Sequence, residues 1–529
     1  MSIAKIKKLP SDTSGKYVNK HGISTTAMKN VIAVSGLLCI LSTIIFDKTQ
    51  TIKTFIVPLA VLSAIALTSI FLAIKKWLSD FYAVLLMFAA GFAVRLNYVL
   101  ITDVTRRVRQ HDVFPFGGDK GHSAYIEHFY KHGFTLPDFN PATKAQFYHP
   151  PLHHFLSALW MRLLTTFGMS YERAITSLPF LTLFYSMCML VVCERILDTL
   201  NLKGFGKLLP LMIITFHPTM ILLSGSINND NLALLFTLLA IYTTLKWYKM
   251  PSDKNIFFIA LSIGLGMSTK MSVALIAPPV AMIFIVKILS ENNRFKKYLI
   301  QYIKFGLVCF PLGLWFFIRN FIKYKLPITY VPRLSETADQ YVGFRSVYER
   351  LIDLSQNPFK NIFINNTQSG GSYFEYNPFV SIIKSSVFGE YALTKYNPDV
   401  LIPCKILLIL NIVMIILSII TSIYCLVKKS RYMDNLTKTF FVLYYVFLMV
   451  FFVKFSFDFP HTCSMDFRYL GVTVVIGAVF MGMFSEHIKL NHKKHSEVIL
   501  FVRTFLFTAA SAFSIFSVLV YTMIGKLGK

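Results

Sequence analysis

The side chains best suited to chemistry gather in residues 111–127, which read His-Asp-Val-Phe-Pro-Phe-Gly-Gly-Asp-Lys-Gly-His-Ser-Ala-Tyr-Ile-Glu. Two carboxylates, Asp112 and Asp119, and the imidazole of His122 stand there among glycines. A carboxylate in such a position can act as a general base that takes the proton of a hydroxyl group. By composition alone a solvated loop is an equally good interpretation, so the rest of the chain has to decide.

A second stretch, residues 146–154, places three histidines, His149, His153 and His154, around two prolines. Proline fixes the backbone and favours the start of a helix, so His149 is expected at a helix entry. Zinc is a possible occupant, but neighbouring histidines point to different faces of a helix, and no carboxylate stands at ligand spacing. We therefore expect no metal and no cofactor.

Four further segments carry isolated polar groups. The turn Ser-Gly-Ser-Ile-Asn-Asn-Asp-Asn, residues 224–231, contains Asp230 and is either part of a site or a hairpin cap. Lys270 follows Thr269, Glu390 lies in Phe-Gly-Glu-Tyr, and Arg468 lies in Ser-Met-Asp-Phe-Arg-Tyr.

The elements that hold these residues are apolar. Of the 529 residues 55% are hydrophobic and only 15% are charged, which excludes a soluble core. The apolar residues form blocks long enough to cross a bilayer. We predict an all-α polytopic membrane protein with about thirteen spans, at residues 28–46, 55–74, 81–101, 175–193, 208–223, 232–247, 256–267, 271–288, 303–321, 401–427, 440–452, 471–484 and 498–524.

The excess of basic residues gives the orientation. Lysine and arginine outnumber the acids 53 to 26, which in a soluble protein would suggest nucleic acid. Here every second short connection is basic, as the positive-inside rule requires of cytoplasmic loops, and no nucleic-acid module is present. We expect a cell-membrane protein with a cytoplasmic N-terminus and four outer segments, residues 102–173, 224–231, 322–400 and 456–466.

The apolar segment that begins at His153 carries Arg162 within a short length. If it crossed the bilayer, all later loops would change sides and the basic ones would face outward. We therefore predict a helix that lies in the outer interface, with Trp160 at headgroup level. An ordinary span is the alternative.

The order of these motifs is similar to that of the GT-C glycosyltransferases. An aspartate-bearing first outer loop, a His-Pro-Pro-Leu segment and an Asn-Asn-Asp turn resemble family 39, the bacterial relatives of protein O-mannosyltransferases and of the lipid A aminoarabinose transferase. The resemblance extends from about Arg95 to Tyr469. It implies a GT-C helical bundle with amphipathic surface helices in the first large outer loop.

The resemblance also implies a reaction: inverting transfer of one sugar from a polyprenyl-phosphate donor to a hydroxyl on the non-cytoplasmic face. Asp112 corresponds to the family's base, with Gly121 and His122 following, but Val113 replaces the usual acidic neighbour. Asp119 is the alternative base. The implied partners are the bilayer, the lipid-linked sugar and a glycan, lipid or protein acceptor.

A departing phosphate needs positive charge, and Lys270, His149 and Arg468 lie near the outer ends of predicted spans. Arginines at a membrane boundary are often only anchors, which is the alternative for Arg468 and Arg95. Asp230 is expected to orient its neighbours. The loop 322–400, with Glu390, is expected to recognise the acceptor.

The chain then divides into a basic N-terminus (1–27), three spans (28–101), the catalytic loop (102–173), six spans (174–321), the acceptor loop (322–400) and the C-terminal spans (401–529). Two other functions remain open. A transporter or flippase for a lipid-linked sugar would usually show internal repeats, and none is found. A ligase or polymerase would be expected to centre on an arginine and a histidine in a large loop.

Overall fold

The computed structural model describes residues 24–45, 56–102, 104, 113–338, 340–353, 375–389, 398–429, 432–490 and 496–523. Asp112 and Glu390 lie outside these residues. The described helices are α1 (Thr25–Ile45), α2 (Ile56–Ile74), α3 (Asp80–Ile101), α4 (Gly121–Lys131), α5 (Leu152–Thr166), α6 (Tyr171–Thr199), α7 (Phe205–Phe216), α8 (Pro218–Ser224), α9 (Asp230–Lys249), α10 (Asp253–Met267), α11 (Ala277–Ser290), α12 (Phe295–Tyr324), α13 (Val347–Leu351), α14 (Pro378–Phe388), α15 (Pro398–Val427), α16 (Asn435–Asp458), α17 (Val472–Leu490) and α18 (Ser496–Met523). Short 3₁₀ helices are η1 (Pro141–Thr143), η2 (Met271–Ile276), η3 (Asn292–Arg294), η5 (Thr462–Met465) and η6 (Phe467–Leu470).

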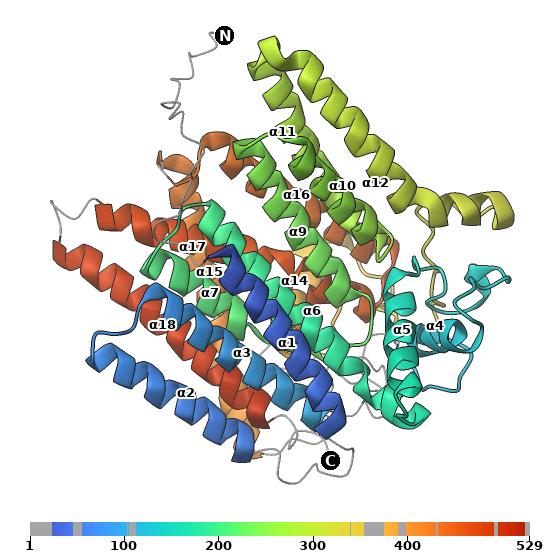
Figure 1. The fold of residues 1–529 in the computed structure, drawn as a ribbon, viewed down its shortest axis with the longest axis horizontal. Helices are drawn as coiled ribbons and strands as arrows, with labels where there is room; N and C mark the ends of the chain where they lie inside the picture. The colour runs from blue at the N-terminus through green and yellow to red at the C-terminus, as the bar shows by residue number, and fades with distance from the viewer. Residues whose placement is uncertain are drawn as a thin grey trace.

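The predicted all-α class is confirmed. The long helices run side by side in one bundle, with α6 packed against α1, α3 and α9 (Figure 1). Within the described ranges, eight helices are long and apolar enough to cross a membrane, or up to ten if each of two bent pairs is one span. The predicted count of thirteen is not confirmed: α2, α9 and α10 are helical but are not among these eight or ten.

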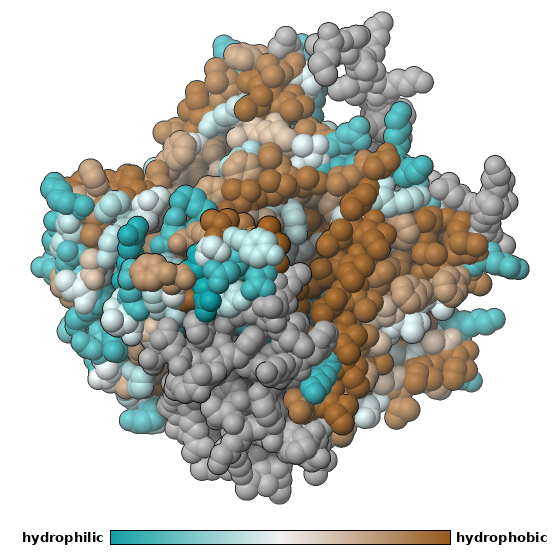
Figure 2. Space-filling model, turned by 180° about the vertical axis from the view of Figure 1, so that it is seen from behind, coloured by the Kyte–Doolittle hydropathy of each residue, from teal (hydrophilic) through white to brown (hydrophobic). Residues whose placement is uncertain are grey.

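The outward-facing side chains are those of a membrane protein. Leu67, Leu307, Ile423 and Phe501 are each more than half exposed, although they are large and apolar. Figure 2 shows how such residues join into a broad apolar surface on one face of the molecule. In water this surface would be unfavourable, whereas lipid tails solvate it. The chain is a multi-pass membrane protein.

One predicted span is broken. Pro218 cannot donate a backbone hydrogen bond, and α7 and α8 meet at His217 with a bend of 52°. Arg95 on α3 is fully buried and donates from Nη1 to the Thr215 carbonyl oxygen at 2.9 Å, beside the break, and from Nε to Ser186 Oγ at 2.8 Å. Cations stabilise helix C-termini, and the guanidinium satisfies a carbonyl at this one. Arg95 is therefore an internal brace rather than an anchor at the lipid surface.

The segment predicted to be the first outer loop contains α4 and α5, which pack on each other at one end of the bundle (Figure 1). Their shared core contains Tyr125, Phe129, Phe147, Ala158 and Met161, all less than a tenth exposed. α5 has 15 residues and is not among the helices long and apolar enough to cross a membrane. Its position in the outer interface stays a prediction.

Candidate functional site

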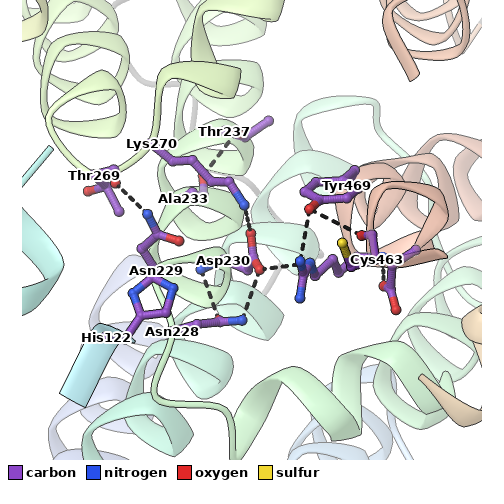
Figure 3. Close-up of polar contacts among 12 residues, drawn as sticks. His122, Asn228, Asn229, Asp230, Ala233, Thr237, Thr269, Lys270, Cys463 and Tyr469 are labelled. Carbon is purple, nitrogen blue, oxygen red and sulfur yellow. Dashed lines mark hydrogen bonds and ion pairs between the residues drawn. The ribbon is translucent and has the colours of Figure 1, made fainter. Parts of the chain in front are cut away.

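The carboxylate of Asp230 lies between two cations from distant parts of the chain. Its Oδ1 forms an ion pair with Lys270 Nζ, and its Oδ2 lies 3.5 Å from Arg468 Nε. All three side chains are largely buried, with exposed fractions of 7%, 12% and 6% in the order Asp230, Lys270, Arg468. Figure 3 shows Asp230 at the centre of this cluster, between Lys270 and Tyr469.

Two helix ends and one short 3₁₀ turn bring these groups together. Asp230 is the first residue of α9, directly after the polar turn. Lys270 stands between α10 and η2. Arg468 lies in η6, where Asp466 caps the turn by accepting a hydrogen bond from the Arg468 backbone N–H at 2.7 Å. Side chains at such ends project beyond the helices, which is why polar groups can meet there.

Hydrogen bonds fix the turn that carries Asp230. Asn228 Nδ2 donates to Asp230 Oδ2 at 3.0 Å, and the Asp230 backbone N–H donates to Asn228 Oδ1 at 3.1 Å. Asn229 Nδ2 donates to the carbonyl oxygen of Thr269 at 3.0 Å, which ties the turn to the residue before Lys270. The carboxylate therefore has a defined direction, as expected for a residue that orients its neighbours.

Tyr469 adds an aromatic face to the two cations. Lys270 Nζ and Arg468 Cζ each lie 4.9 Å from the centre of its ring. Arg468 Nη2 donates to the Tyr469 hydroxyl oxygen at 2.8 Å. The ring limits where both cations can lie, and together with Asp230 they leave one net positive charge.

A row of three imidazoles lies beside this charge. The rings of His149 and His122 are nearly parallel with centres 5.5 Å apart, and those of His122 and His154 are nearly parallel with centres 5.1 Å apart. His122 Nδ1 and His154 Nε2 are hydrogen-bonded at 2.8 Å. We call His149, His122 and His154 the histidine row.

Burial, and to a smaller extent neighbouring groups, lowers the pKa values of all three histidines in the row. Burial lowers the pKa of His122 well below its ordinary value, and nearby histidines, Lys270 and Arg468 lower it further. The pKa of His149 is lowered well below its ordinary value by burial and then by Lys270, His154 and Arg468. Desolvation likewise dominates the lowered pKa of His154. Neutral imidazoles can both donate and accept hydrogen bonds.

The start of α5 is hydrogen-bonded to the segments that carry Asp230 and Lys270. His153 Nε2 lies 2.7 Å from the carbonyl oxygen of Ile227, just before the polar turn. The Leu152 backbone N–H donates to the Ser268 carbonyl oxygen at 3.0 Å. The His-Pro-Pro-Leu segment, the polar turn and the residues before Lys270 therefore form one connected unit.

The structure brings His122, His149, Asp230, Lys270 and Arg468 into one region. The alternative base Asp119 is exposed in the turn before α4. Arg468 is buried and paired, so its alternative as an anchor at the lipid boundary does not hold.

Sequence reasoning considered His154 only as a metal ligand and gave no role to Tyr469 or Asn228. Tyr469 follows Arg468 directly, and an aromatic residue beside a candidate cation was a usable signal. Across the described residues, no group of three or more histidines, cysteines and acids is arranged to hold a metal ion.

Part of the chain matches a known protein family. Residues 148–315 match the family described as dolichyl-phosphate-mannose-protein mannosyltransferase, a GT-C family domain. The match covers about a third of the chain and includes His149, Asp230 and Lys270. No curated protein matches the chain significantly. The domain supports a GT-C glycosyltransferase of the mannosyltransferase type.

Proposed function

We propose that this chain transfers one sugar, with inversion, from a polyprenyl-phosphate donor to a hydroxyl acceptor on the non-cytoplasmic face of the membrane. The observation that carries the proposal is the buried pair of cations, Lys270 and Arg468, that shares the single carboxylate of Asp230. The family match over residues 148–315 supports the same reaction class. Donor and acceptor identities beyond these classes are left open.

The charges of the cluster suit a phosphate leaving group. A sugar phosphodiester carries one negative charge and gains a second as the sugar leaves. Lys270, Arg468 and Asp230 together carry one net positive charge before the donor binds. Fixed cations in a buried site stabilise developing charge more strongly than water does. We assign Lys270 and Arg468 to the phosphate, and His122 and His149 to the rim of the same donor site.

We assign the general base to Asp112, with Asp119 as the alternative. Support for Asp112 comes from its neighbour Val113, whose carbonyl oxygen accepts from the Ser123 backbone N–H at 3.0 Å and from Ser123 Oγ at 2.6 Å. Ser123 follows His122, so Val113 is held close to the histidine row. The exposure of Asp119 makes it the weaker candidate.

We assign acceptor recognition to the loop 322–400, with Glu390 as its candidate residue. Support comes from the described parts of this loop, which reach the Arg468 segment. Ser381 Oγ donates to the Met465 carbonyl oxygen at 3.0 Å, and the Phe467 backbone N–H donates to Ser385 Oγ at 2.9 Å. An acceptor held by this loop would lie beside the phosphate site.

The base assignment is tested by Asp112→Asn in purified protein reconstituted into vesicles with a radiolabelled polyprenyl-phosphate sugar. General-base catalysis typically contributes about 10²–10⁴-fold, so transfer should fall by that factor while abundance is unchanged. Asp119→Asn serves as the comparison and should retain transfer. Full activity of Asp112→Asn together with an inactive Asp119→Asn would exchange the two roles.

The same vesicles separate transfer from transport. An enzyme cleaves the bond between sugar and phosphate, so the label leaves the lipid and appears on the acceptor. A flippase moves the intact lipid to the other leaflet. Movement of the intact donor without cleavage would reject the enzymatic function.

A further inference from the structure

The reaction proposed above leaves a proton to be placed. The bond between the anomeric carbon and the phosphate oxygen breaks, and its electron pair stays on that oxygen. The acceptor oxygen bonds to the same carbon and loses its proton. A phosphodiester of charge −1 has then become a monoester whose second pKa is about 6, so near neutral pH most of one proton per turnover is released. A base that keeps this proton cannot act again.

We propose that the histidine row accepts this proton after it leaves the base. The proposal rests on the proposed function, because it needs a phosphate monoester to form beside Lys270 and Arg468. Accepting the proton is a separate role from donor binding, to which His122 and His149 were assigned above. It also adds His154 to the residues that serve the reaction.

The geometry of the row suits proton transfer. His122 Nδ1 and His154 Nε2, 2.8 Å apart, share one hydrogen bond, in which one nitrogen donates its proton and the other accepts it with its lone pair. The ring of His149 lies 5.5 Å from that of His122 and is partly exposed, whereas His122 and His154 are 3% and 0% exposed. The row therefore runs from the partly exposed His149 to the buried interior.

The surrounding charges make the row responsive to phosphate. The ionisable groups that face it are His153 on α5, Tyr125 on α4, Tyr148 beside His149, Lys270 before η2, Arg468 in η6 and, through these cations, Asp230 on α9. Burial disfavours imidazolium most strongly, and the two cations disfavour it further. A doubly charged phosphate beside Lys270 and Arg468 would outweigh their positive charge, so the electrostatic cost of a proton on the row would fall.

The test measures proton uptake when phosphate esters bind to the purified full-length protein. Geranylgeranyl monophosphate carries a second charge, whereas its methyl diester cannot. Calorimetric titration at pH 7.0 in two buffers of different ionisation enthalpy gives the number of protons taken up. Wild-type protein should take up more protons with the monoester than with the diester, by a large fraction of one proton.

Substitutions in the row should remove this difference at saturating monoester. His122→Asn and His149→Asn lie at the rim of the donor site and are expected to weaken monoester binding, but once saturated each should lose most of the extra uptake. His132→Asn, an exposed histidine outside the row, should keep it. Since His122 is buried, His149→Asn at the partly exposed end provides a second test in case His122→Asn fails to fold.

Four outcomes overturn specific claims. Equal uptake with both esters in wild-type protein, or unchanged extra uptake in the two row variants, rejects the proton-accepting row while leaving the phosphate site intact. Monoester binding that is insensitive to Lys270→Met rejects the phosphate site itself. Absence of binding to wild-type protein rejects the phosphate site and, with it, the role of the row.

Discussion

Asp230 compensates part of the positive charge of Lys270 and Arg468. Lys270 and Arg468 both lie against the Asp230 carboxylate, and two buried like charges so close together repel each other. The carboxylate offsets this repulsion. A donor phosphate of charge −1 would bring the cluster close to neutrality. Asp230 therefore lets the two cations share a buried site before the substrate arrives.

The first prediction concerns these two cations. Lys270→Met and Arg468→Met should each lower kcat of sugar transfer by about 10²–10³-fold, because each removes one group that stabilises the phosphate charge in the transition state. Lys323→Met is the matched control, since Lys323 is exposed and pairs with the exposed Asp138. Assays in vesicles with labelled donor give kcat and KM separately. Near wild-type kcat in both site variants would refute the assignment.

The second prediction concerns stability at low pH. Burial lowers the pKa of His153 to about 4, and the pKa values of His122, His149 and His154 are also depressed. An unfolded histidine has a pKa of about 6.5, so between pH 6.5 and 4 the unfolded state binds more protons than the folded state. The free energy of unfolding should therefore decrease as the pH is lowered through this window, by up to about 1.4 kcal/mol per pH unit for each such histidine.

Thermal unfolding in detergent at pH 7.5 and 5.5 checks this direction. The apparent Tm of wild-type protein should be lower at pH 5.5. His154→Gln should show a smaller pH difference, although its Tm at pH 7.5 is also reduced by the lost packing against Tyr125. His132→Gln, at an exposed position, should behave like wild type. A larger difference in His154→Gln than in wild type would contradict the neutral, buried state of this histidine.

The sequence identified Asp230, Lys270 and Arg468 as candidates because polar residues at the ends of apolar segments stand out. It did not predict that they share one ion cluster. Asp230 and Arg468 are far apart along the chain, and their contact depends on how α9 packs near η6. The hydrogen bond between His122 and His154 also depends on the packing of α4 on α5, which no local pattern encodes.

At the scale of elements, the segment that carries Arg468 is held by the described parts of the loop 322–400. Thr462 N–H donates to the Gln340 carbonyl oxygen at 2.9 Å, and Arg350 Nη2 donates to the Ser456 carbonyl oxygen at 2.6 Å. α14 adds the two bonds made by Ser381 and Ser385. Inside this assembly, Glu375 and Lys384 form an ion pair in which both side chains are fully buried.

The third prediction concerns this pair. Lys384→Met leaves the Glu375 carboxylate buried without its cation and should lower stability by about 3–5 kcal/mol. Replacing both residues, as Glu375→Gln with Lys384→Met, should recover much of this loss because no buried charge remains. Thermal unfolding of the single and double variants measures the coupling. Equal losses in the single and double variants would show that the pair does not act as an ion pair.

The sequence predicts where most long helices lie but not where a helix is broken. Hydropathy located most long helices because lipid requires apolar side chains over a fixed length. It joined α7 and α8 into one span, since both halves are apolar and the bend occurs at a single His-Pro step. Arg95 on α3, whose guanidinium binds beside this bend, had an anchor at the lipid surface as its alternative interpretation. The sequence could not decide, because the acceptors Ser186 and Thr215 are distant along the chain.

At the scale of the whole molecule, one question about α5 fixes the compartment of every later loop. If α5 lies in the interface, His132 before it and Phe344 after it face the same side. Four spans lie between these two residues along the chain: α6, the α7–α8 pair, α11 and α12. If α9 and α10 both cross the membrane as well, the number is six. Either number is even, so the two residues are exposed on the same side. A crossing by α5 makes the count odd and places the two residues on opposite sides.

The fourth prediction follows from this parity. Single cysteines replace His132, Phe344 or Lys296, which are exposed, in a Cys463→Ser background because the other six cysteines lie in apolar segments. A membrane-impermeant maleimide added to intact cells should label positions 132 and 344. Position 296, in a basic connection, should react only after permeabilisation, because positive charge is retained on the cytoplasmic side. Labelling of 132 and 344 from opposite sides would mean that α5 crosses the bilayer. Asp112 and the Arg468 segment would then face different compartments, which a single transfer site does not allow.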